Sequence, residues 1–174
     1  LGYSDDVLIK LPENWSGAED EYGNLFSAVD GKILTNIPAY GTKIMHRIDA
    51  AQKEEVQLKY GDLTLENDKI IYQFNNSGQL IKIFDKELKR EFLDPGQRGN
   101  ILSLYVDYPV RYEAWEIDNS FRDAKVCEAE PLKILKKSSS IFSALEIEYK
   151  IGSSKIRQNI VLLPESRELR FETI

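Results

Sequence analysis

Histidine and cysteine are almost absent from this sequence, and their scarcity excludes several kinds of site. Of the 174 residues, His46 is the single histidine and Cys127 the single cysteine. A zinc site that needs two imidazoles cannot form within this chain, so we expect no metal site and no catalytic centre in it. Cys127 cannot form an internal disulfide, which favours a reducing compartment, and we therefore expect a cytoplasmic location.

Long apolar runs, basic clusters and nucleophile motifs are missing as well. No run approaches the roughly 20 apolar residues of a membrane-spanning helix, and the basic residues are scattered, so we expect no membrane partner. The net charge of −6 argues against binding to a phosphate backbone, so we expect no nucleic-acid partner. The sequence also lacks a Gly-x-Ser-x-Gly elbow and a glycine-rich phosphate loop.

Alternation of apolar and polar residues is the dominant pattern that the sequence does have. In "LEIEYKI", residues 145–151, every second residue is apolar and the intervening ones are charged, which predicts a half-buried strand. Tight hairpins are predicted at Asn75–Gly78, at Asp30–Gly31 and within "IGSSKI", because these residue types tolerate the backbone of tight turns. Long helical periodicity is missing, so the expected fold class is all-β, with helix limited to short turns.

These patterns predict a small β unit followed by a larger one. Residues 1–49 contain short strands and form a small β domain, in which Trp15 anchors the sheet and His46 faces water. Residues 50–59 are polar and charged and are predicted to be a linker. Residues 60–174 are expected to form a larger antiparallel β-sandwich unit.

Both ends of the chain indicate a piece cut from a longer protein. The sequence begins without methionine, and it stops at "ELRFETI", inside an expected strand with no turn after it. An open sheet edge at "RELRFETI" can template pairing with another strand. We therefore expect possible self-association.

The stretch "PVRYEAWEIDNSF", Pro109–Phe121, concentrates aromatic and acidic residues. The candidate site residues are Tyr112, Glu113, Trp115, Glu116 and Asp118. Aromatic rings beside carboxylates are typical of sugar-binding sites, because pyranose rings pack on them and hydroxyls donate to the acids. Strand alternation, however, divides the cluster between two faces. Two interpretations stay open: Trp115 fills the core while the acids meet solvent, or the cluster lines a ligand cleft.

Several motifs follow one another along the chain in a particular order. They are Leu65-Glu66-Asn67, Gly78-x-Leu-x-x-Ile-x-Asp85-Lys86-Glu87, Gly99-Asn100 and "PVRYEAWE". In this order they resemble the segment that opens the large C-terminal β-sandwich of the zinc-dependent retaining α-mannosidases, and Pro38–Gly41 is similar to the end of that family's short β domain. Tyr112, Glu113 and Glu116 stand where the family has tryptophan, aspartate and aspartate.

The resemblance implies a galactose-mutarotase-like supersandwich, of which residues 60–174 would be the first part. It also implies a parent enzyme that hydrolyses α-mannosidic bonds with retention, using one carboxylate as nucleophile and another as acid. The family's zinc ligands, two histidines and two aspartates, and its nucleophilic aspartate lie in an N-terminal catalytic region. This segment is thus expected to be inactive by itself and to hold no cofactor, with zinc implied for the parent. The implied partners are the catalytic domain of the same polypeptide and a mannose-containing oligosaccharide, and Glu113, Trp115 and Glu116 would belong to the cleft wall or the domain interface.

Two other functions are compatible with an all-β chain. A free-standing carbohydrate-binding or structural β-sandwich module would use the same aromatic and acidic residues without a catalytic partner. A sugar mutarotase of similar architecture needs a catalytic histidine near a glutamate, and His46 is the only histidine available. The α-mannosidase interpretation is the one that the ordered motifs favour.

Overall fold

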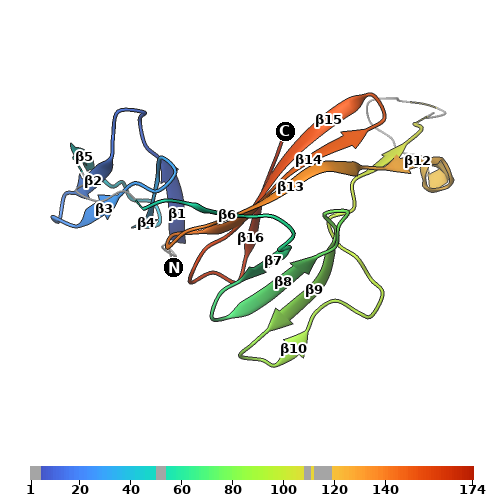
Figure 1. The fold of residues 1–174 in the computed structure, drawn as a ribbon, viewed down its shortest axis with the longest axis horizontal. Helices are drawn as coiled ribbons and strands as arrows, with labels where there is room; N and C mark the ends of the chain where they lie inside the picture. The colour runs from blue at the N-terminus through green and yellow to red at the C-terminus, as the bar shows by residue number, and fades with distance from the viewer. Residues whose placement is uncertain (1–4, 50–53, 108–110, 112–118) are drawn as a thin grey trace. The chain divides into compact units, whose positions relative to one another are not determined.

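The computed structural model describes residues 5–49, 54–107, 111 and 119–174. These residues form sixteen β-strands and one short 3-10 helix, η1 (Asn119–Asp123), and no α-helix occurs among them (Figure 1). Each strand pair with a defined register is antiparallel. The predicted all-β class with antiparallel sheets is confirmed.

Two compact units make up the chain. Unit 1 contains residues 1–58 and 137–143, and unit 2 contains residues 59–136 and 144–174. Within the range predicted to be a linker, residues 50–53 lie outside the described residues and Gln57–Lys59 form strand β6. The boundaries proposed from the sequence, 1–49, 50–59 and 60–174, stay a prediction.

Unit 1 is built from two small sheets, in which β1 pairs with β4, and β2 pairs with both β3 and β5. The strands are β1 (Asp5–Lys10), β2 (Gly17–Asp20), β3 (Leu25–Ser27), β4 (Lys32–Ile37) and β5 (Met45–Ile48). A small core consists of Leu11, Ala18 and Ile33, against which Trp15 packs. Trp15 therefore contributes to the core as predicted, and His46 is exposed on β5.

The Asp30–Gly31 turn forms, but the hairpin that it was predicted to close is only one residue pair long. Both turn residues have positive φ angles, 51° and 69°, and Val29 and Lys32 exchange backbone hydrogen bonds across them at 2.8 and 3.0 Å. Beyond this pair β3 and β4 belong to different sheets. The predicted hairpin turn at Asp30–Gly31 is confirmed. Its ladder is short because turn residues specify a local reversal, whereas strand pairing depends on distant partners.

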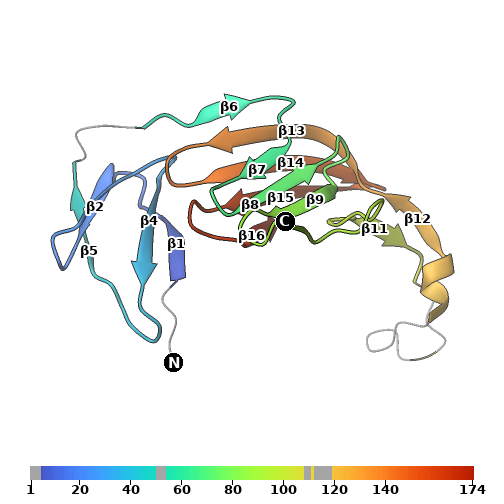
Figure 2. The same ribbon diagram turned by 90° about the horizontal axis from the view of Figure 1, so that it is seen from below.

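Unit 2 contains two sheets that pack face to face (Figure 2). Their strand orders are β10-β9-β8-β7 and β16-β15-β14-β13-β6, and β11 and β12 form a separate ribbon. The strands are β7 (Thr64–Glu66), β8 (Ile70–Phe74), β9 (Leu80–Asp85), β10 (Arg90–Glu91), β11 (Ser103–Tyr105), β12 (Lys125–Glu128), β13 (Glu130–Ser138), β14 (Ser143–Ile151), β15 (Ser154–Leu162) and β16 (Leu169–Thr173).

Apolar side chains from both sheets form one core, as expected of a β-sandwich. The buried members from the first sheet are Leu65, Ile70, Tyr72, Phe74 and Leu80, and those from the second are Leu145, Ile147, Tyr149, Ile160 and Leu162. Along β14 the residues alternate between this core and exposed positions such as Glu148 and Lys150. The half-buried strand predicted from "LEIEYKI" is confirmed.

The predicted hairpins of unit 2 form as well. Strands β8 and β9 pair around Asn75–Gly78, with Phe74 opposite Leu80, and β14, β15 and β16 lie next to one another in one sheet. Strand β16 is at the end of that sheet and pairs within it with β15 alone. Such an edge presents unpaired backbone groups, and self-association through it stays a prediction.

Candidate functional site

The five site residues proposed from the sequence lie outside the described residues. Tyr112, Glu113, Trp115, Glu116 and Asp118 belong to the range 112–118. Neither interpretation of this cluster is decided, and its role stays a hypothesis. The described residues that flank it in the sequence belong to the β11–β12 ribbon and to η1.

Described residues that precede and follow this range in the sequence contact one another at the β11–β12 ribbon. The rings of Tyr105 and Phe121 meet edge to face, with centroids 5.3 Å apart and an interplanar angle of 73°. The amide of Val106 donates to the carbonyl of Ala124 at 2.9 Å, and that of Ala124 donates to Phe121 at 2.9 Å. An edge-to-face aromatic pair contributes about 0.5–1.5 kcal/mol beyond the area that it buries, so this contact stabilises the ribbon.

A charged cluster is centred on Glu128 of strand β12. The Glu128 carboxylate accepts hydrogen bonds from Lys125 Nζ at 2.5 Å and from Gln79 Nε2 at 2.8 Å. Arg98 donates to Gln79 Oε1 at 2.8 Å and lies 3.8 Å from Glu128. The hydrogen bond from Lys125, followed by the one from Gln79, lowers the pKa of Glu128. Glu128 is therefore ionised near neutral pH and acts as an anchoring acceptor, not as a general acid.

A second polar cluster joins the two sheets through the backbone of Gly78. Asn100 Nδ2 donates to the Gly78 carbonyl at 2.9 Å and to Gln158 Oε1 at 2.7 Å. The Tyr149 hydroxyl donates to the same carbonyl at 3.3 Å. Asn100 has a φ of 53°, a conformation that asparagine tolerates better than most residues. Two of the motif residues, Gly78 and Asn100, therefore stabilise the sandwich.

Tyr149 leads to a prediction about stability at alkaline pH. Burial raises the pKa of its hydroxyl to about 12 and also raises the pKa of Tyr72. The unfolded chain ionises these phenols near their usual pKa of about 10, so the stability that they contribute is present below that pH and is lost as the pH rises toward 12. In an absorbance titration of tyrosinate, we expect the signals lost on Tyr149→Phe and on Tyr72→Phe to belong to phenols that ionise above the usual tyrosine pKa.

The Tyr149→Phe variant should lose less stability between pH 10 and pH 12 than the unmodified chain. Tyr22→Phe is the matched control, because the Tyr22 ring is 79% exposed. The urea midpoint at each pH measures the effect. If the urea midpoint falls equally with pH in Tyr149→Phe and in the unmodified chain, the raised pKa is not that of Tyr149.

A third polar cluster surrounds Asp85, which is 2% exposed. Its carboxylate accepts from the backbone amides of Glu87 at 2.9 Å and Leu88 at 2.8 Å. Arg167 Nε donates to it at 2.9 Å and its guanidinium also pairs with Glu87. The Leu88 amide and the Arg167 side chain lower the pKa of Asp85. The Asp85-Lys86-Glu87 motif thus forms a turn that is tied to the β15–β16 connection.

Sequence reasoning missed the partners of these motifs, chiefly Gln79, Gln158 and Arg167. One signal was available for Gln158, because it falls on the same face of its alternating strand as Ile160 and Leu162. It is 3% exposed. A polar residue at an inward position needs a hydrogen-bond partner, but the sequence does not identify Asn100 as that partner.

The residues described do not fit the zinc that the resemblance implies for the parent. No group of three metal-ligating side chains occurs in the described ranges, and His46 is isolated and exposed on β5. Within the same ranges, no helix is long and apolar enough to cross a membrane. The described polar clusters around Gly78, Asp85 and Glu128 organise the fold.

Comparison with known proteins gives a family for this arrangement. Residues 65–174 match the model of the glycosyl hydrolases family 38 C-terminal domain. This range begins at the first motif residue and includes the motifs built around Gly78, Asp85 and Asn100. No match to a curated protein was found. The chain belongs to glycosyl hydrolase family 38, and its residues 65–174 come from the C-terminal, non-catalytic region of that family.

Proposed function

We propose that this chain is the non-catalytic β-sandwich region of an α-mannosidase, an enzyme that hydrolyses α-mannosidic bonds with retention. The observation that carries this proposal is the family match over residues 65–174. The reacting carboxylates and the zinc ion belong to the catalytic domain of the same polypeptide, and the substrate is a mannose-containing oligosaccharide. The present region supplies a folded support for that domain.

Residues 112–118 are proposed to line the catalytic cleft or the interface with the catalytic domain. Their acidic side chains can accept hydrogen bonds from sugar hydroxyls, and their aromatic rings can pack against a pyranose face. The Tyr105–Phe121 contact and the adjacent backbone hydrogen bonds support this role, because they hold together the described residues that flank residues 112–118 in the sequence.

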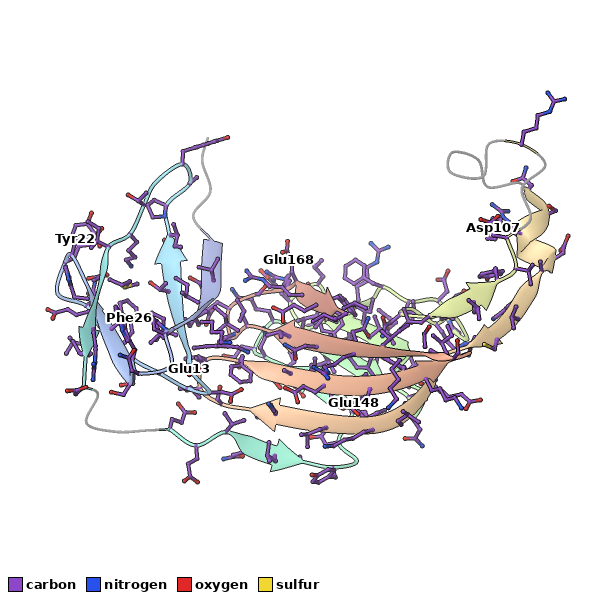
Figure 3. All side chains as sticks on the ribbon, turned by 90° about the horizontal axis from the view of Figure 1, so that it is seen from above. Glu13, Tyr22, Phe26, Asp107, Glu148 and Glu168 are labelled. Carbon is purple, nitrogen blue, oxygen red and sulfur yellow. The ribbon has the colours of Figure 1, made fainter. Side chains whose placement is uncertain are left out.

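Kinetics of the parent polypeptide test this placement. Replacing Glu116→Gln and Asp118→Asn together should lower kcat/KM for an aryl α-mannoside by at least tenfold. Each amide keeps a neutral hydrogen bond, and a hydrogen bond to a charged group contributes about 1 kcal/mol more than a neutral one. The matched control is Glu148→Gln, because Glu148 is exposed on β14 (Figure 3). Unchanged kinetics in the double variant would remove the ligand role and leave a structural one.

A further inference from the structure

Unit 1 contains a hollow of about 350 Å³ that neither the family match nor the proposed function uses. Its lining includes Glu13, Asn14, Trp15, Asp30 and Glu54, and Glu13 lies on the connection between β1 and β2 (Figure 3). Pockets of roughly 300–1,000 Å³ hold small molecules. The hollow is therefore large enough for a single sugar ring.

Hydrogen bonds within unit 1 fix the walls of this hollow. The amide of Trp15 donates to the carbonyl of Pro12 at 3.0 Å, and the amide of Leu11 donates to Gly31 at 2.8 Å. The Glu54 carboxylate accepts from the backbone amide of Ser140 at 2.6 Å and also from its hydroxyl. A preformed site loses less conformational entropy when a ligand binds.

Trp15 gives the hollow an apolar wall. The indole is half-buried, because it packs against the core of unit 1 and also lines the hollow. An aromatic ring held in this way can pack against the apolar face of a pyranose without ordering a mobile side chain. One side of the hollow therefore suits a sugar ring.

The polar wall suits a neutral ligand with many hydroxyls better than a cation. The Glu54 carboxylate already accepts hydrogen bonds from Ser140. The Asp30 carboxylate already has a cationic neighbour, because it lies 3.6 Å from the ammonium of Lys137. The described residues offer no set of three metal-ligating side chains. Glu13 and Asn14 are exposed and form no hydrogen bond with any other described residue. Their oxygens are thus free to accept sugar hydroxyls.

We infer that unit 1 binds a pyranose ring of an oligosaccharide in this hollow, with the ring against Trp15 and its hydroxyls bonded to Glu13 and Asn14. The choice of a sugar rests on the proposed function, in which the parent acts on oligosaccharides. The site would retain one residue of a branched or extended substrate on unit 1.

Nuclear magnetic resonance of the 174-residue chain can test this inference with methyl α-mannopyranoside and an α-linked mannobiose as probes. The chain has two tryptophans, and a Trp115→Phe variant assigns the two indole N–H signals. We expect the Trp15 signal to shift and to saturate with a dissociation constant of about 1 mM, which corresponds to about 4 kcal/mol of binding. Glu13→Gln and Asn14→Ala should each weaken binding about fivefold.

Two variants protect the test against misfolding and non-specific effects. Trp15→Phe is used in place of Trp15→Ala, because it keeps an aromatic ring in the small core. It should weaken sugar binding, while a dispersed amide spectrum shows that the chain stays folded. Tyr22→Ala removes a ring that is 79% exposed and does not line the hollow, so it should leave the affinity unchanged.

Three results would overturn the inference: no shift of the Trp15 signal at saturating sugar concentrations, equal affinity in the Glu13 and Asn14 variants, or a response to alkylammonium ions in place of the sugars. The result is independent of the mannosidase activity of the parent. If the chain does not bind the sugars but the parent hydrolyses α-mannosides, only the proposed site is wrong. If the chain binds the sugars but the parent does not hydrolyse α-mannosides, only the proposed function is wrong.

Discussion

Replacing Gly78 with alanine should destabilise the chain by roughly 3–5 kcal/mol, the largest effect expected of a single methyl group in this fold. Gly78 has a φ of 71°, which an alanine adopts only with strain. An added Cβ would also overlap the Tyr149 hydroxyl and lie 3.0 Å from Ile147 Cδ1. Both neighbours belong to the buried core, so little space is available for them to move.

Urea unfolding of Gly78→Ala and of a matched control can separate these two causes. Gly96 has a φ of 80° and no atom within 4 Å of an added Cβ, so Gly96→Ala should cost only about 1–2 kcal/mol of backbone strain. Adding Tyr149→Phe to Gly78→Ala should restore part of the loss, because it removes the overlapping hydroxyl. Equal losses in Gly78→Ala and Gly96→Ala would contradict the packing argument.

The Asn67→Ala variant should lose roughly 2–4 kcal/mol of unfolding free energy, because one side chain makes four hydrogen bonds. Asn67 Nδ2 donates to the carbonyls of Leu163 at 2.9 Å and Ser166 at 2.6 Å. Its Oδ1 accepts from the amides of Lys69 at 2.9 Å and Ile70 at 3.0 Å. The amide thus uses both donors and its acceptor, and it connects the β7–β8 turn to the β15–β16 connection.

A second substitution distinguishes the two halves of this arrangement. Asn67→Asp retains an oxygen for the amides of Lys69 and Ile70 but places a second acceptor against two carbonyls, so most of the loss should remain. Asn76→Ala is the matched control, since Asn76 is exposed in a turn and should change stability by less than about 0.5 kcal/mol. A full recovery of stability in Asn67→Asp would show that the bonds to Leu163 and Ser166 contribute nothing.

The motifs that carry the family resemblance are largely connections between parts of the sandwich. Asn67, Gly78, Asp85 and Asn100 each bond or pack against a residue far away in the sequence. Their requirements are geometric, since Asn67 places a short carboxamide against two carbonyls and two amides, and an added Cβ at Gly78 would overlap Tyr149. The resemblance in these motifs therefore identifies a shared fold, and it does not identify the reacting groups.

Local patterns were sufficient to predict the strands and most turns. Alternation in "LEIEYKI" follows directly from burial of one face, and Asn75–Gly78 forms the predicted hairpin. Pairings between distant strands were not predictable in the same way: β4 joins β1 and not β3, because the ladder depends on side-chain packing that no single segment contains. The same reason explains why Arg167 was not recognised as the partner of Asp85.

The sequence predicted which residue types the candidate site contains, but not how they are arranged. Acidic and aromatic residues between 112 and 118 indicated sugar recognition, but the choice between core and cleft depends on contacts outside the described residues. The hollow beside Trp15 was missed because its walls come from separate segments, the turn after β1, the Asp30–Gly31 turn and Glu54. The sequence indicated Trp15 only as a core residue.

Hydrolysis of an aryl α-mannoside, followed by proton magnetic resonance, tests the central claim that this chain supports catalysis without performing it. The 174-residue chain and its parent polypeptide are compared at equal concentration, each with zinc present. We predict no hydrolysis by the chain alone, and release of the α anomer of mannose as the first product of the parent. Hydrolysis by the isolated chain, or a parent that leaves α-mannosides intact, would contradict the account.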